Sequence, residues 1–176
     1  VTIGGMAKGS GMIAPNMATM LAFITTDANV SGDILQHALK EAADHSFNRI
    51  SVDGDTSTND MVLMLANGEA GGREIRSLLD PAYPVFYEAL EYLLTKLSKM
   101  IVVDGEGATK FVEIRVINAL TEEVAVQAGK AVANSSLVKT AINGEDANWG
   151  RILAAVGNSG VEFDPDCLDC LVMGDR

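Results

Sequence analysis

Aromatic residues are scarce in this sequence: Phe, Tyr and Trp together make up 5% of its 176 residues. A hydrophobic core must therefore rest on Ala, Val, Leu, Ile and the eight Met. Cysteine is scarcer still, and the only two, Cys167 and Cys170, form a single C-x-x-C pair. That spacing suits a redox pair or half of a zinc site. Because there is no second such pair and the two His are distant in sequence, we interpret both as incidental thiols in a reducing compartment and predict no metal.

Basic residues are also few, since 13 Lys and Arg face 24 Asp and Glu and the net charge is −11. Such a surface repels phosphate backbones, which excludes nucleic acid as a partner. No uninterrupted apolar run approaches the roughly 20 residues that a membrane helix needs. The first five residues lack the basic region of a signal peptide. We therefore expect a cytoplasmic protein without a membrane segment, and the missing initial Met suggests a segment or a processed product.

The hydrophobic share of 48% and the charged share of 21% are typical of a globular protein. The length suits one domain or a large part of a bigger layered fold. The patterns predict a strand pair, then a helix, a strand, a helix, a strand and further helices. This order predicts an α/β (α+β) fold with helices packed on sheets. Because so few strands are complete, we expect another polypeptide or a missing segment to finish the sheet.

Apolar residues recur at helical spacing in several segments. Ser31 is placed to cap a helix beginning near Gly32, with His37 and His45 at its surface side or its end. Trp149, the only tryptophan, is predicted to anchor an interface between layers. Further helices are predicted over 81–100, from Thr121 onward and over 147–156. Strands are predicted over 20–24, 61–66 and 111–117, with a glycine turn at 101–107 between two strands and a last strand starting after 163.

The stretch from Lys8 to Phe23 runs from a glycine-rich polar segment into an apolar strand across the pair Ala18-Thr19. A Thr hydroxyl is a weak nucleophile until a base lies beside it, and a freed N-terminal amine is one such base. Small, permissive residues before Thr19 make self-cleavage there conceivable. By spacing alone, a glycine-rich hairpin leading into a buried strand is the commoner arrangement. Both interpretations stay open on this evidence.

Two polar turns are candidate site walls. The loop over 54–60, together with Asp53 directly before it, carries three Asp and several hydroxyls before an apolar strand. It either satisfies its own backbone or binds a cation or a substrate amino group, although its spacing does not match an EF-hand loop. In the second turn, Glu106 stands between two glycines. It is either an exposed side chain or a carboxylate offered to a cationic substrate.

Several separated motifs resemble one family, that of ornithine acetyltransferase (glutamate N-acetyltransferase) of arginine biosynthesis. They span nearly the whole chain in the expected order, and the set is far more specific than any one member. The matching stretches are 4–12 (GGMAKGSGM), 15–21 (PNMATML), 25–27 (TTD), 53–60 (DGDTSTND), 104–110 (DGEGATK), 136–141 (SLVKTA) and 148–157 (NWGRILAAVG).

The resemblance implies a precursor that cuts itself between Ala18 and Thr19. Residues 1–18 would be the tail of an alpha chain, and residues 19–176 most of a beta chain, truncated at its C-terminus. Thr19 would then bind the substrate, take the acetyl group from N-acetylornithine and pass it to glutamate. Lys8 matches a lysine that binds the substrate, and Glu106 matches an acid that meets its amino groups.

The same resemblance implies a DmpA-like and ornithine-acetyltransferase-like layered sandwich of mixed sheets flanked by helices, of which this chain is a fragment. Two alpha and two beta chains would form a heterotetramer. No metal or cofactor is implied, although bifunctional members use acetyl-CoA as a co-substrate. In the family, the Thr-Gly oxyanion hole lies in an N-terminal region that this sequence does not contain. The sequence also does not contain the family's C-terminal strands, which close the site. The alternatives are a related self-processed aminopeptidase or amidase, and a non-catalytic fragment.

Overall fold

The computed structural model describes residues 1–9, 20–54 and 59–173. These form two compact units, Val1–Ala108 and Thr109–Arg176, and each is described by itself. The predicted cleavage site, Ala18 and Thr19, lies outside the described residues.

A three-stranded sheet forms the first unit's framework, in the order β1 (Ile3–Lys8), β2 (Leu21–Thr26) and β3 (Met61–Ala66). β1 is antiparallel to β2, with Lys8 opposite Leu21, and β2 is parallel to β3, with Leu21 level with Met61. The predicted opening strand pair and the predicted strand over 61–66 are therefore confirmed. The parallel pairing places the starts of β2 and β3 at one end of the unit, where β1 ends.

The alternation of side chains along each strand gives the sheet two different faces. In β2, Ala22 and Ile24 are fully buried, whereas Phe23 between them is exposed. The buried face packs on two helices. The other face leaves five large apolar side chains exposed, which we call the open face: Met6, Phe23, Met61, Leu63 and Leu65.

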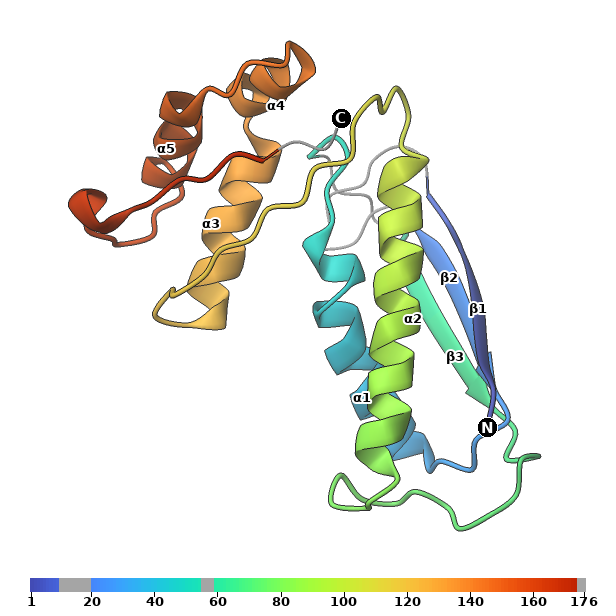
Figure 1. Ribbon diagram of the computed structural model, residues 1–176. Helices are drawn as coiled ribbons and strands as arrows, with labels where there is room; N and C mark the ends of the chain where they lie inside the picture. Colours follow the sequence, from blue (N-terminus) through green and yellow to red (C-terminus); the bar gives the residue numbers. More distant parts are fainter. Residues whose placement is uncertain (10–19, 55–58, 174–176) are drawn as a thin grey trace. The chain divides into compact units, whose positions relative to one another are not determined.

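Helices α1 (Gly32–Asp44) and α2 (Tyr83–Val103) lie side by side over the buried face of the sheet (Figure 1). α1 contributes small residues such as Ala38 and Ala42, both without exposed surface. α2 contributes a stripe at helical spacing, in which Leu90 and Leu94 are completely buried. Gly5 lets β1 approach this helix closely, because a Cβ there would lie 3.2 Å from Leu97 Cδ1. The short 3-10 helix η1 (Phe47–Arg49) adds Phe47 to the same core.

The structure confirms the helix predicted near Gly32 and corrects the bounds of the one predicted over 81–100. α2 begins two residues later, with Pro84 in its first turn, and continues through Val103. Residues 101–103 are therefore helical rather than the first part of the glycine turn predicted over 101–107. Ile101 explains the extension, because it continues the buried stripe of α2 into the core. His45 ends α1 as its C-cap, as expected for a surface or capping His.

The second unit contains α3 (Glu122–Asn134), α4 (Ser136–Asn143), α5 (Trp149–Gly157) and the 3-10 helix η2 (Pro165–Cys167). A small core of Val132, Val138 and Ala155 holds the three α-helices together. The helical pattern predicted from Thr121 onward and the helix predicted over 147–156 are confirmed, with α4 as a separate helix between α3 and α5, and each of the three has a side-chain N-cap. Thr121, Ser135 and Asn148 accept hydrogen bonds from backbone N–H groups in the first turns of their helices.

Three predictions for this unit were wrong. Residues 111–117 form no strand, because no other described segment pairs with their backbone. After residue 163 the chain forms η2 rather than a strand. Trp149 is 63% exposed at the start of α5, so within the second unit it anchors no interface.

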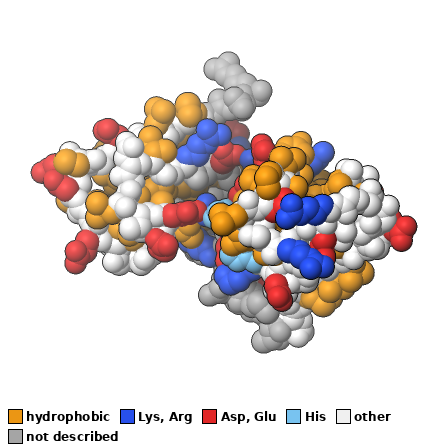
Figure 2. Space-filling model, turned by 90° about the horizontal axis from the view of Figure 1, so that it is seen from below, with side chains coloured by type: hydrophobic (Ala, Val, Ile, Leu, Met, Phe, Trp, Pro, Cys, Tyr) orange, Lys and Arg blue, Asp and Glu red, His pale blue; other side chains and the backbone are white. Residues whose placement is uncertain are grey.

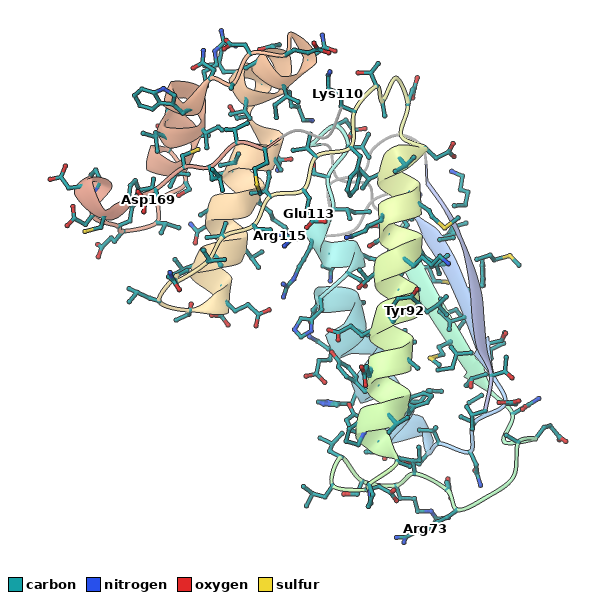
Figure 3. All side chains as sticks on the ribbon, in the orientation of Figure 1. Arg73, Tyr92, Lys110, Glu113, Arg115 and Asp169 are labelled. Carbon is teal, nitrogen blue, oxygen red and sulfur yellow. The ribbon has the colours of Figure 1, made fainter. Side chains whose placement is uncertain are left out.

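Glu113 and Arg115 form an ion pair of 2.6 Å on the extended segment before α3 (Figure 3).

Charged side chains are scattered over the face shown in Figure 2, with acidic and basic groups interspersed among hydrophobic ones. The excess of acidic residues is therefore not gathered into one patch on this face. Within the described ranges, no helix combines the length and apolarity required to cross a membrane.

Candidate functional site

One end of the first unit collects the segments that carry the predicted site. β1 ends there, β2 and β3 start there, and the C-terminal end of α2 lies at the same end (Figure 1). The long loop before α2, with Arg73 labelled on it, lies at the opposite end of the unit (Figure 3). The site therefore has to be built from strand starts and the turn after α2.

Met20, the first described residue after Thr19, is held at both polar atoms of its backbone. Its N–H donates to Asp60 Oδ1 at 2.6 Å, and its carbonyl accepts from the Met61 N–H at 2.9 Å. Its side chain is 7% exposed and belongs to the core between sheet and helices. Met20 is thus tied to the start of β3 from two sides.

Asp60 is a partly buried carboxylate directly before β3. Burial raises the pKa of Asp60, and the hydrogen bond from the Met20 N–H opposes the rise without cancelling it. Burial disfavours the charged form because water solvates it better than the protein does, whereas an N–H donor favours it. The site therefore carries an ionisable group whose charge costs stability in the folded state.

Lys8 lies at the end of β1, directly opposite Leu21 of β2. Its side chain is exposed and shares the open face of the sheet with Met6, two residues before it. The antiparallel register therefore brings a cationic side chain to a point two residues from Thr19 along the neighbouring strand.

Glu106 lies in a tight turn immediately after α2 and is exposed. The turn is closed by hydrogen bonds from Gly105 N–H to the Val102 carbonyl at 3.2 Å and from Ala108 N–H to the Gly105 carbonyl at 3.0 Å. Gly105 is buried against Val52, where a Cβ would lie 2.9 Å from Val52 Cγ1. The turn that carries Glu106 is thus packed against the segment leading into the 54–60 loop.

The structure brings together some of the predicted site residues. Lys8 and the strand that follows Thr19 are paired, while Ala18 and Thr19 lie outside the described residues. Among the residues that the structure describes, no hydrogen bond or ion pair joins Lys8 to Glu106. Sequence reasoning assigned no individual role to Asp60, which contacts Met20. Its position directly before an apolar strand was the available signal, but only the parallel register shows which backbone atom it meets.

A second polar cluster joins α1 to α2 on the helical side of the first unit. His45 Nδ1 lies 2.8 Å from Glu91 Oε1 and 3.2 Å from the Tyr87 hydroxyl. Burial, with the nearby Glu41 and Glu91 carboxylates, raises the pKa of Tyr87, so its hydroxyl stays protonated. This cluster links the two helices. Across the described part of the chain, no group of three or more His, Cys, Asp or Glu is arranged to hold a metal ion.

The fold and these strand starts define a mixed α/β protein with its candidate functional site at one end of the sheet. The model of the ArgJ family matches residues 1–175, and the chain belongs to this family. The α/β fold class expected from the sequence and the family resemblance are therefore confirmed.

Individual relatives with high sequence identity carry the name of the same family. The chain is 57% identical over 174 residues to the "Arginine biosynthesis bifunctional protein ArgJ" of Oceanobacillus iheyensis, covering 99% of the chain and 42% of the relative. It is 59% identical over 175 residues to the protein of the same name from Symbiobacterium thermophilum, covering 99% and 43%. The crystal structure of the Bacillus halodurans protein of that name matches with a TM-score of 0.80 and 49% identity, over 83% of this chain and 68% of that one. The chain thus spans about two fifths of the length of these curated relatives.

Proposed function

We propose that this chain is part of a self-processing acetyltransferase that moves an acetyl group from N-acetylornithine to glutamate in arginine biosynthesis. The observation that carries the proposal is the β1–β2 register, which pairs Lys8 with Leu21 and so sets a cation beside the strand that follows Thr19. The family match over residues 1–175 supports the same assignment.

Self-cleavage would proceed by attack of Thr19 Oγ on the Ala18 carbonyl carbon. The Ala18–Thr19 C–N bond breaks, the nitrogen takes up the hydroxyl proton and becomes a free amine, and Ala18 becomes an ester of Thr19. Water then hydrolyses the ester, which leaves an Ala18 carboxylate, a Thr19 hydroxyl and a new N-terminus at Thr19. This step would divide residues 1–18 from residues 19–176.

In the transfer cycle the Thr19 amine acts as base for its own hydroxyl. Oγ attacks the acetyl carbonyl of N-acetylornithine, the C–N bond breaks, and ornithine leaves with a proton on its amine. The glutamate amine then attacks the acetyl ester, which restores the hydroxyl and releases N-acetylglutamate. The word "bifunctional" in the relatives' names is compatible with acetyl-CoA as a second donor, and no metal or other cofactor enters the proposal.

Lys8 and Glu106 would bind the amino-acid substrate by its opposite charges. Lys8 offers an ammonium to the carboxylate, and Glu106 offers a carboxylate to the amino group. Both side chains are exposed in this chain, and the buried contact of Gly105 with Val52 holds the Glu106 turn in place. We propose that the enzyme acts in the cytoplasm, as expected from the sequence.

The open face of the sheet supports a complementary chain as partner. Its five large apolar side chains form one exposed face of a three-stranded sheet, and such faces mark interaction sites. We propose that the rest of the precursor packs there as a second layer and supplies the oxyanion hole. Two alpha and two beta chains would then form the αβ heterotetramer.

The test uses a precursor containing this sequence together with the remaining length found in its relatives. Intact-mass analysis should show two chains, the second beginning at Thr19, and Thr19→Ala should leave one unbroken chain without transferase activity. A wild-type precursor that stays unbroken would refute the self-processing mechanism.

A related aminopeptidase or amidase would resolve the acyl-enzyme with water. Incubating the processed protein with N-acetylornithine and glutamate separates the two activities. We expect N-acetylglutamate to form in step with ornithine, whereas acetate without N-acetylglutamate would assign the hydrolytic activity. A folded fragment without catalysis would give neither product.

A further inference from the structure

The residue that follows the proposed nucleophile is fixed more firmly than strand pairing alone requires. The Met20 N–H donates to the Asp60 carboxylate at 2.6 Å, and the Met20 carbonyl accepts from the Met61 N–H at 2.9 Å. The Met20 side chain is buried in the core. Two neighbouring residues at the start of β3 thus hold both backbone polar atoms of Met20.

The hydrogen bond from the Met20 N–H to Asp60 takes the place of the next backbone hydrogen bond between the parallel strands β2 and β3. Because Leu21 is level with Met61, Asp60 is level with Met20, and its side chain accepts the N–H that precedes the strand. A hydrogen bond to an ionised carboxylate is shorter and about twice as strong as one between neutral groups. The start of β2 is therefore held by an oxygen of the Asp60 carboxyl group.

Covalent geometry carries this restraint to the preceding residue. The peptide unit that contains the Met20 N–H also contains the carbonyl group and the Cα atom of Thr19, and these atoms share one plane. Restraining the N–H and Cα of Met20 therefore restrains the point from which the Thr19 side chain departs. Rotation about the Thr19 Cα–C bond and about χ1 then sets the place of its hydroxyl.

We infer that Asp60 is a positioning residue for Thr19, acting through the Met20 N–H in both self-cleavage and acetyl transfer. The inference rests on the proposed function, since it concerns the same nucleophile. A misplacement of about 1 Å can cost on the order of 10²-fold in rate, so loss of this anchor should be visible in kinetics.

The first test follows cleavage of the precursor during cell-free translation by intact mass. Asp60→Ala should slow breakage of the Ala18–Thr19 bond by about 10- to 100-fold. Asp60→Asn keeps an acceptor oxygen at the same place and should retain most of the wild-type rate. This rescue by the conservative variant separates an acceptor role from a role of the charge.

The chain offers a control of the same kind at the opposite end of β2, where that strand pairs with β1. There the Thr2 N–H donates to Asp27 Oδ1, also at 2.6 Å. Asp27→Ala removes the same kind of hydrogen bond and should leave the cleavage rate unchanged. A general loss of stability in the three-stranded sheet would affect both variants alike.

A second readout does not depend on cleavage. In a Thr19→Ala precursor, which stays unbroken, the Met20 amide should be protected from hydrogen exchange. Adding Asp60→Ala should remove that protection, and adding Asp27→Ala should not. In processed enzyme, Asp60→Ala should lower kcat for acetyl transfer and leave the KM for N-acetylornithine nearly unchanged, because Lys8 and Glu106 remain.

The outcomes separate this inference from the proposed function. A wild-type precursor that does not cleave would overturn both. If the wild type cleaves, the inference alone is overturned by an Asp60→Ala variant as fast as wild type, by Asp60→Asn as slow as Asp60→Ala, or by equal slowing in Asp27→Ala. Unchanged Met20 exchange in Asp60→Ala would overturn it as well.

Discussion

Gly105 offers a sharp test of how the Glu106 turn is held. A Cβ at this position would lie 2.9 Å from Val52 Cγ1, 3.2 Å from Val52 Cγ2 and 3.1 Å from the Val102 carbonyl oxygen. The Gly105 φ angle is not positive, so alanine is acceptable to the backbone itself. The cost of Gly105→Ala should therefore come from crowding, and overpacking of this kind costs about 1–3 kcal/mol.

The source of the crowding can be isolated with a double-mutant cycle. Val52→Ala removes two methyl groups from a half-buried side chain and should cost about 1 kcal/mol by itself. In that background the new methyl group of Gly105→Ala has room, and its cost should fall to a few tenths of a kcal/mol. The predicted coupling between the two sites is then about 1–2 kcal/mol.

Gly107→Ala is the matched control in the same turn. Gly107 has a φ of +70°, and nothing lies within 4 Å of where its Cβ would be. Alanine there should cost about 1 kcal/mol through backbone strain, and Val52→Ala should give no relief. Val52→Ala should therefore reduce the cost of Gly105→Ala but not the cost of Gly107→Ala, and this difference distinguishes crowding from backbone strain.

The assay can follow the two units separately. All three tyrosines, Tyr83, Tyr87 and Tyr92, lie on α2 in the first unit, whereas the single tryptophan lies in the second. Urea unfolding monitored by near-UV circular dichroism of tyrosine should shift for Gly105→Ala, while tryptophan fluorescence should stay unchanged. If Gly105→Ala costs the same stability in the wild-type background as in the Val52→Ala background, the packing argument is refuted.

Three further predictions follow from other parts of the chain. Thr121→Ala removes a hydrogen-bonded N-cap and should destabilise the second unit by about 1 kcal/mol in urea unfolding. Ser31→Ala should destabilise the first unit much less in the same assay, because the Ser31 side chain makes no cap hydrogen bond. Burial raises the pKa of Asp60 in the folded state, so its contribution to stability is fully present below the ordinary pKa and is lost as pH rises through the folded value. Asp60→Asn should therefore gain stability relative to wild type as pH rises above the ordinary pKa of an Asp, and a difference in urea midpoints that stays constant with pH would contradict this. Leu65→Lys on the open face, where the side chain is 59% exposed, should leave unfolding of this chain within about 0.5 kcal/mol of wild type but abolish co-purification with the rest of the precursor, while Leu79→Lys, at 92% exposure in a loop, should affect neither.

Local patterns predicted much of this fold because they depend on which face a segment buries. The apolar stripe of α2 needs only the 3.6-residue period, and Leu90 and Leu94 lie where that period puts them. The N-cap at Thr121 needs only its hydroxyl and the N–H groups of the next turn. The strand over 61–66 is likewise local, an apolar run bounded by polar turns.

Local patterns failed where the answer depended on a distant backbone. Residues 111–117 alternate as a strand would, yet a strand exists only where another strand accepts its hydrogen bonds. Trp149 is apolar enough for a core but lies at the first position of α5, exposed within its unit. In both cases the sequence shows which structure the segment is able to form, but not which other part of the protein it contacts.

By itself, the sequence determined the family, the α/β class and the residues to propose as nucleophile and substrate-binding groups, because these depend on residue types in a fixed order. Only the tertiary structure decided that Lys8 lies opposite Leu21 and that Asp60 holds the Met20 N–H. Strand register joins residues about 13 and 40 positions apart through their backbones, and backbone atoms are the same whatever the side chain. The anchor beside the proposed nucleophile therefore becomes visible only once the strands are paired.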